Sequence, residues 1–127
     1  MAAEVETDQS ELVRQAALDY FEGWYDADPA RLDRAVHAEL VKRSFDADGL
    51  ATLGEPRSKA QMVEWTKDGG GSDRGPAWEQ GIDVEVLDVY RGTASVLVRS
   101  REYHEHLHLM QTSSGWQIVN AFWVYTT

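Results

Sequence analysis

The spacing of apolar residues changes halfway along this chain of 127 residues. Up to about residue 68, apolar side chains recur every three or four positions, which is the period of a helix with one buried face. From residue 82 onward they alternate with polar side chains, which is the period of a β-strand. Helices followed by consecutive strands predict an α+β domain, with helices packed on one face of a curved antiparallel sheet.

The first two helices are marked by capping residues and by one apolar stripe. Asp8 and Glu11 have the spacing of a capping box, and Asp28 is followed by a proline, Pro29, at the first helical position. We therefore expect helices over about 8–25 and from Pro29 to near His37. The first carries a broad apolar stripe of Leu12, Val13, Ala16, Ala17, Tyr20, Phe21 and Trp24.

A third helix is expected after an extended segment at 40–45 and a loop at 49–56. Ser58 and Gln61 form a second capping pattern that starts this helix. The three glycines at 69–71 end it, because glycine is a poor helix former. Residues 72–81 then form a polar connection to the strands.

Four strands follow, separated by short turns. Alternation predicts strands near 82–86, 94–98, 103–110 and 116–124. If Gly115 forms a left-handed bulge after the last turn, Thr112 pairs with Trp116. One face then holds His104, His106, His108, Trp116, Ile118, Asn120 and Phe122. The other holds Glu105, Leu107, Leu109, Val119, Ala121 and Trp123. A two-residue turn would shift this register.

Charge and cysteine content exclude several classes of function. The chain has 12 Lys and Arg against 22 Asp and Glu, for a net charge of −10. Such acidity disfavours nucleic acids and anionic membranes as partners. There is no cysteine, so disulfides, thiolate metal sites and a cysteine nucleophile are absent. No leader or membrane-spanning segment is recognisable, so we expect a soluble cytoplasmic protein. We expect residues 1–7 to be disordered and residues 8–127 to form a single domain.

His37, Glu105 and His106 are the candidate catalytic residues, because imidazole and a carboxylate in an apolar pocket suit proton transfer. Glu105 and His106 are neighbours on a strand and point to opposite faces, so at most one of them lines a given pocket. Arg43 and Asn120 are candidates to hold a carbonyl or a developing oxyanion. Each residue taken singly also has an ordinary structural explanation, such as a helix cap or a surface ion pair.

The aromatic residues indicate where a ligand would be enclosed. Five tryptophans are more than a core of this size needs. A pocket between helices and a bent sheet suits large rings with polar tips. The candidate binding residues are Tyr20, Trp24, Arg43, Trp65, Tyr103, His108, Asn120, Phe122 and Trp123.

The alternating histidines His104, His106 and His108 lie about 6.5 Å apart along one side of their strand. Such a run is a possible metal site or simply a set of strand residues, and we assign no metal because no carboxylate ligand is spaced to join it. No cofactor is expected either. Both faces of the last two strands are apolar enough to be buried, which predicts a homodimer through the sheet.

The order of elements and several local motifs resemble the nuclear transport factor 2-like superfamily, which includes ketosteroid isomerase, scytalone dehydratase and polyketide cyclases. Within it the chain is most similar to the lumazine-binding group. The matching stretches are DYFEGWY at 19–25, His37 with LVKR at 40–43, SKAQMVEWT at 58–66, YHEHLHL at 103–109 and GWQIVN at 115–120.

This resemblance implies a cone-shaped α+β fold, a pocket between helices and sheet, and a homodimer formed sheet to sheet. The same scaffold hosts enzymes, binding modules and transport factors. The function we expect is that of a cofactor-independent acid–base enzyme of isomerase, dehydratase or cyclase type, acting on a small apolar or polycyclic molecule. The alternatives are a non-catalytic small-molecule binding protein and a dimeric interaction module.

Overall fold

The computed structural model describes residues 2–45 and 52–126, with side chains described from Gln9 onward. Part of the expected loop at 49–56 lies outside these residues. Three helices form the first layer: α1 (Ala2–Tyr25), α2 (Pro29–Ala35) and α3 (Lys59–Lys67). Two short 3₁₀ turns follow, η1 (Ser72–Arg74) and η2 (Ala77–Glu79). The strands are β1 (Val36–Arg43), β2 (Asp83–Tyr90), β3 (Thr93–Arg99), β4 (Tyr103–Thr112) and β5 (Gly115–Tyr125).

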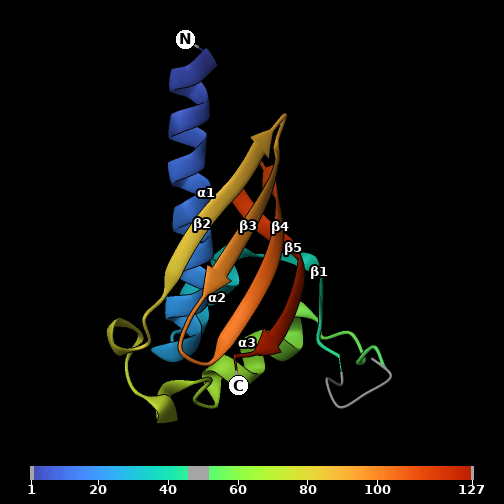
Figure 1. Ribbon diagram of the computed structural model, residues 1–127. Coiled ribbons are helices and arrows are strands. Elements are labelled where there is room, and N and C mark those ends of the chain that lie inside the picture. The colour runs from blue at the N-terminus through green and yellow to red at the C-terminus, as the bar shows by residue number, and fades with distance from the viewer. Residues whose placement is uncertain (1, 46–51, 127) are drawn as a thin grey trace.

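These elements form the expected α+β cone, in which α1 runs along one face of a strongly curved sheet and α2 and α3 lie toward one end (Figure 1). The helix α1 includes residues 2–7, for which we had expected no regular structure. Two of the three capping predictions are confirmed, since Asp28 caps α2 and Ser58 forms a capping box with Gln61 in α3. The third is wrong, because α1 begins at Ala2 and Asp8 and Glu11 therefore lie inside the helix rather than at its start. Within the described residues, no helix combines the length and apolar character needed to cross a membrane.

The sheet is mixed, which corrects the expectation of a purely antiparallel one. Its strand order is β1-β5-β4-β3-β2, and β1 runs parallel to β5 while the other neighbours are antiparallel. The strand β1 also begins earlier than expected, because α2 ends after Ala35 and Val36 already has extended backbone angles. Val36 then pairs with Ile118, so the strand follows the helix without a loop.

The register of the last hairpin differs from the expectation near its turn. Thr112 pairs with Gly115, which is the two-residue turn, and Trp116 pairs with Gln111. A bulge between the pairs His108–Asn120 and Leu109–Ile118 then restores the expected register. The pairs His108–Asn120 and His106–Phe122 are therefore confirmed. Trp116 and Ile118 are moved to the core face, where both are buried.

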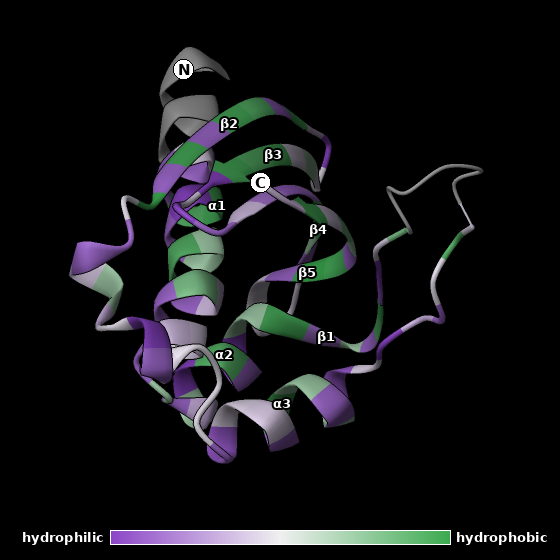
Figure 2. Ribbon diagram, turned by 60° about the horizontal axis from the view of Figure 1, so that its bottom comes forward, coloured by the Kyte–Doolittle hydropathy of each residue, from purple (hydrophilic) through white to green (hydrophobic). Residues whose placement is uncertain are grey.

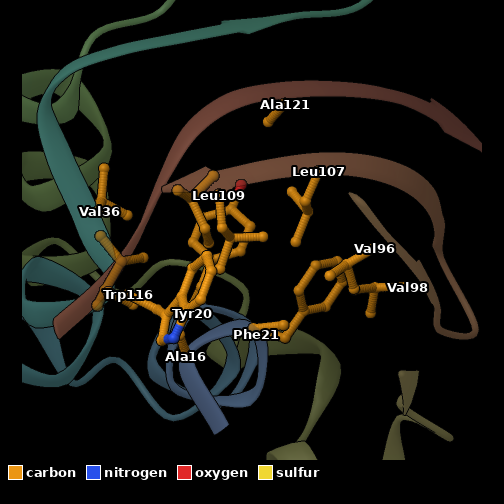
Figure 3. Close-up of a cluster of buried hydrophobic side chains, with 14 of the residues drawn as sticks. Ala16, Tyr20, Phe21, Val36, Val96, Val98, Leu107, Leu109, Trp116 and Ala121 are labelled. Atoms are coloured by element: carbon orange, nitrogen blue, oxygen red, sulfur yellow. The ribbon is translucent and has the colours of Figure 1, made fainter. Parts of the chain in front are cut away.

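The hydrophobic core fills the space between α1 and the concave face of the sheet. Tyr20 and Phe21 from α1 meet Val96, Leu107 and Leu109 from the strands (Figure 3). Hydrophobic stretches occur on both α1 and the strands that curve around it (Figure 2). The predicted stripe on α1 is narrower than expected at its start, because Leu12 is 54% exposed.

Gly70 and Gly71 attach the segment after α3 to the end of α1. The Gly71 N–H donates to the Trp24 carbonyl at 3.0 Å, and Gly70 has a positive φ of 51°. A Cβ added at Gly70 would lie 2.3 Å from the same carbonyl oxygen. This contact needs glycine both for its backbone angle and for its lack of a side chain.

We expect Gly70→Ala to lower the free energy of unfolding by about 3 kcal/mol, since backbone strain and a backbone clash act together. Gly81→Ala is the matched control: Gly81 has a φ of 62°, but an added Cβ would meet nothing within 4 Å. It should therefore cost only about 1 kcal/mol. Urea denaturation followed by tryptophan fluorescence measures both, and equal losses would contradict the close-approach argument.

Candidate functional site

A cavity of about 300 Å³ opens between α1, α3 and the inner face of the sheet. Half of the residues that line it are aromatic: Tyr20, Phe21, Trp24, Trp65, Tyr103, Trp123 and Tyr125. The remaining lining residues are Lys42, Ser44, Gly54, Glu55, Arg57, Met62 and Glu105. Polar chemistry is therefore confined to a few places in an apolar cavity, as in small-molecule binding sites.

Glu105 is the most buried charged group of the cavity, with 1% of its surface exposed. Its Oε2 accepts a hydrogen bond from the Tyr20 hydroxyl at 2.9 Å and one from the Lys42 ammonium at 3.1 Å. Lys42 also donates to the Tyr20 hydroxyl. A buried carboxylate is stable only with such partners, so the three side chains form one unit.

Lys42 reaches this unit because of the parallel pairing of β1 with β5. Lys42 pairs with the buried Ala121, which places its side chain on the inner face of the sheet. Its ammonium lies 4.9 Å from the centre of the Tyr20 ring and 5.7 Å from that of Trp123. These cation–π contacts further hold the charge in the cavity.

Tyr20 acts as a hydrogen-bond donor in this arrangement. Burial raises the pKa of its hydroxyl well above the ordinary value, and the negative charge of Glu105 raises it further. Burial likewise raises the pKa of Tyr103, which also lines the cavity. Both hydroxyls thus keep their protons at neutral pH.

The structure brings six of the predicted site residues together at the cavity and leaves six elsewhere. At the cavity are Tyr20, Trp24, Trp65, Tyr103, Glu105 and Trp123. The choice between Glu105 and His106 is settled in geometry, because Glu105 faces the cavity and His106 is exposed on the opposite face of β4.

The other predicted residues have positions that follow from strand alternation. Arg43 follows Lys42 in β1 and pairs with Phe122, so both lie on the outer face of the sheet. His108 and Asn120 pair on that same face, and the Asn120 Nδ2 lies 3.3 Å from the His108 Nδ1. His37 lies at the start of β1, where its Nδ1 accepts from the Glu39 N–H at 3.0 Å. None of these five lines the cavity.

Lys42, Glu55 and Arg57 are the charged cavity residues that were not predicted from the sequence. Lys42 stands next to Arg43, which we had selected, and alternation makes only one of the two face inward. The parallel pairing with β5 decides between them, and this long-range pairing had not been predicted.

The histidines of β4 lie along the outer face of the sheet. His104 and His106 have ring centres 5.3 Å apart, along the outer face. In the described part of the chain, no three His, Asp or Glu side chains are grouped to hold a metal ion.

Comparison with known proteins identifies the family. The sequence pattern of a family described as "Putative lumazine-binding" matches residues 8–124. The chain belongs to this family. No curated protein matches the sequence of this chain.

Solved structures share the nuclear transport factor 2-like fold of this member of the family. An NTF2-like protein of unknown function from Shewanella baltica OS155 is 13% identical, with a TM-score of 0.71 over 95% of this chain and 96% of that one. A ketosteroid isomerase-like protein from Erwinia carotovora atroseptica is 17% identical, with a TM-score of 0.58 over 92% and 95%. The CaMKII hub of S. rosetta is 13% identical, with a TM-score of 0.56 over 91% and 95%. At these identities the likeness concerns the fold.

We expect Lys42→Met to lower the free energy of unfolding by about 3 kcal/mol, because it leaves the Glu105 carboxylate buried without its counter-ion. Adding Glu105→Gln to this variant should recover most of the loss, since no buried charge then remains. A double-mutant cycle measured by urea denaturation gives the coupling between the two residues. Additive effects of the two substitutions would show that the ion pair does not stabilise the fold.

Proposed function

We propose that this protein is a cofactor-independent acid–base enzyme that moves a proton on a small apolar or polycyclic molecule, in an isomerase, dehydratase or cyclase type of reaction. The observation that carries this proposal is the buried Glu105, held by Lys42 and Tyr20 in an aromatic cavity of about 300 Å³. A carboxylate in such surroundings is suited to remove a proton from carbon.

The three polar groups have separate roles in this proposal. The hydrogen bonds from Tyr20 and Lys42 both end on Oε2 of Glu105, so we assign Oε1 to the proton of the substrate. Glu105 takes that proton as general base and returns it to another atom of the substrate as general acid. Lys42 has three donor hydrogens and uses two of them on Glu105 and the Tyr20 hydroxyl, so the third stabilises negative charge that develops on a substrate oxygen. Tyr20 gives its one hydrogen to Oε2 and holds the carboxylate in place.

A non-catalytic binding protein is the second candidate, and the aromatic wall supports it. Lys42, Tyr20 and Glu105 satisfy one another's hydrogen bonds, so the cavity is stable without a reacting ligand. The family description names a small heterocyclic ligand, lumazine, and a planar heterocycle would stack on the rings of the wall.

Proton exchange separates the two candidates. Incubation of the protein with bicyclic ketones such as 2-tetralone in D₂O, followed by NMR, should show enzyme-accelerated replacement of the α-hydrogens by deuterium. Glu105→Gln should lower this rate at least about 100-fold while keeping the shape of the cavity. His106→Gln, its neighbour on the opposite face, should leave the rate unchanged. Binding of the ketones without acceleration would contradict catalysis and favour the binding protein.

The outer face of the sheet supports a further part of the proposal, a homodimer. Phe122, Met110 and Val41 are 39%, 40% and 39% exposed on this face, beside the histidines of β4. Apolar side chains exposed on one face of a sheet are typical of an interface, and a second copy of the chain would cover them symmetrically.

Phe122→Lys should convert the dimer to a monomer, because it places two like charges in the interface. Sedimentation equilibrium should give twice the mass of the chain for the wild type and the single mass for the variant. Leu12→Lys, an equivalent change at a residue that is 54% exposed on α1, should remain dimeric. A monomeric wild-type protein would contradict this part of the proposal.

A further inference from the structure

Arg57 is fixed at the mouth of the cavity by its pairing with Lys42. The Lys42 N–H donates to the Arg57 carbonyl at 3.0 Å, and the Arg57 N–H donates to the Lys42 carbonyl at 2.7 Å. Residues that face each other in an antiparallel bridge project to the same side. Since Lys42 faces the cavity, the side chain of Arg57 leaves the backbone on that side too, and it lines the cavity.

The guanidinium of Arg57 is positioned by an aromatic ring. Its central carbon lies 5.4 Å from the centre of the Trp65 ring, which also lines the cavity. Arg57 itself is exposed, and it forms no ion pair with any residue that the structure describes. Stacking leaves the edge of a guanidinium available, and that edge matches the two oxygens of a carboxylate.

The other charges of the cavity do not compete for the same ligand group. Lys42 and Glu105 neutralise each other at the floor. Glu55 lies at the rim two residues before Arg57 and is exposed. A cationic ligand would find the aromatic positions next to Tyr20 and Trp123 already taken by the ammonium of Lys42. Arg57 is thus the cavity charge that is best placed to meet a ligand.

We propose that Arg57 binds an acidic group of the ligand, so that the ligand class is a planar conjugated ring system that carries a carboxylate or a similar anion. The inference deepens the proposed function, because it takes the same cavity as the substrate site. The ring system lies between Trp24, Trp65 and Trp123, its reacting carbon reaches Glu105, and its anionic group stays at the mouth. A volume of about 300 Å³ fits a ring system of this size.

Three probes of one shape and different charge test this assignment: 2-naphthoate, 2-acetonaphthone and 2-naphthylmethylammonium. Titration followed by quenching of tryptophan fluorescence, with isothermal calorimetry as a second readout, gives their dissociation constants. The wild type should bind the carboxylate at least about fivefold more tightly than the ketone and should bind the ammonium most weakly.

Arg57→Gln should abolish the preference for the carboxylate while the affinity for the ketone stays within about twofold. Arg57→Lys should keep part of the preference, because it retains the charge and loses the planar fork. Glu55→Gln is the matched control at the rim, and it should keep or increase the preference.

Either of two affinity patterns would overturn the inference: equal affinities of the wild type for the carboxylate and the ketone, or an equal loss of affinity for all three probes in Arg57→Gln. Dissociation constants above about 1 mM for all three probes would overturn the inference as well. The deuterium exchange of Glu105→Gln is a separate readout. Loss of carboxylate preference with exchange intact rejects the role of Arg57 alone, whereas carboxylate preference without exchange rejects catalysis alone.

Discussion

The burial of one carboxylate, Glu105, constrains the rest of this structure. Transfer of an ionised carboxyl group from water to a protein interior costs several kcal/mol unless hydrogen bonds and an opposite charge compensate. Lys42 and Tyr20 supply both. They come from β1 and α1, so the helix, the edge strand and the centre of the sheet must be in register before the carboxylate can be buried.

The same constraint explains why the cavity has an apolar wall and a polar floor. The ion pair occupies the floor, and large rings from α1, α3, β4 and β5 surround it. Gly70 and Gly71 pack closely against the backbone of Trp24, and the Gly71 N–H donates to the Trp24 carbonyl. A wall of rings fixed by backbone contacts cannot collapse easily onto a buried charge, and this preserves space for a ligand.

Local patterns predicted the elements, and pairings between distant residues decided the site. Helical spacing, the caps at Asp28 and Ser58, and alternation in the last four strands are properties of neighbouring residues, so the sequence shows them. The parallel pairing of β1 with β5 joins residues about 80 positions apart, and no local pattern favours Lys42 over Arg43. The bulge after His108 could not be predicted from the sequence either. A two-residue turn followed by a bulge and a longer turn without one give the same residue pairs farther along the strands.

The net charge of the chain bears on how a ligand would be selected. A protein with a charge of −10 repels anions at long range, but salt screens this repulsion beyond about 8 Å. Selection of an anionic ligand must therefore arise from close contact, where a stacked guanidinium and a planar wall act together. It follows that charge selectivity at this cavity would lie in the dissociation rate more than in the association rate, because no attractive field steers an acid toward Arg57.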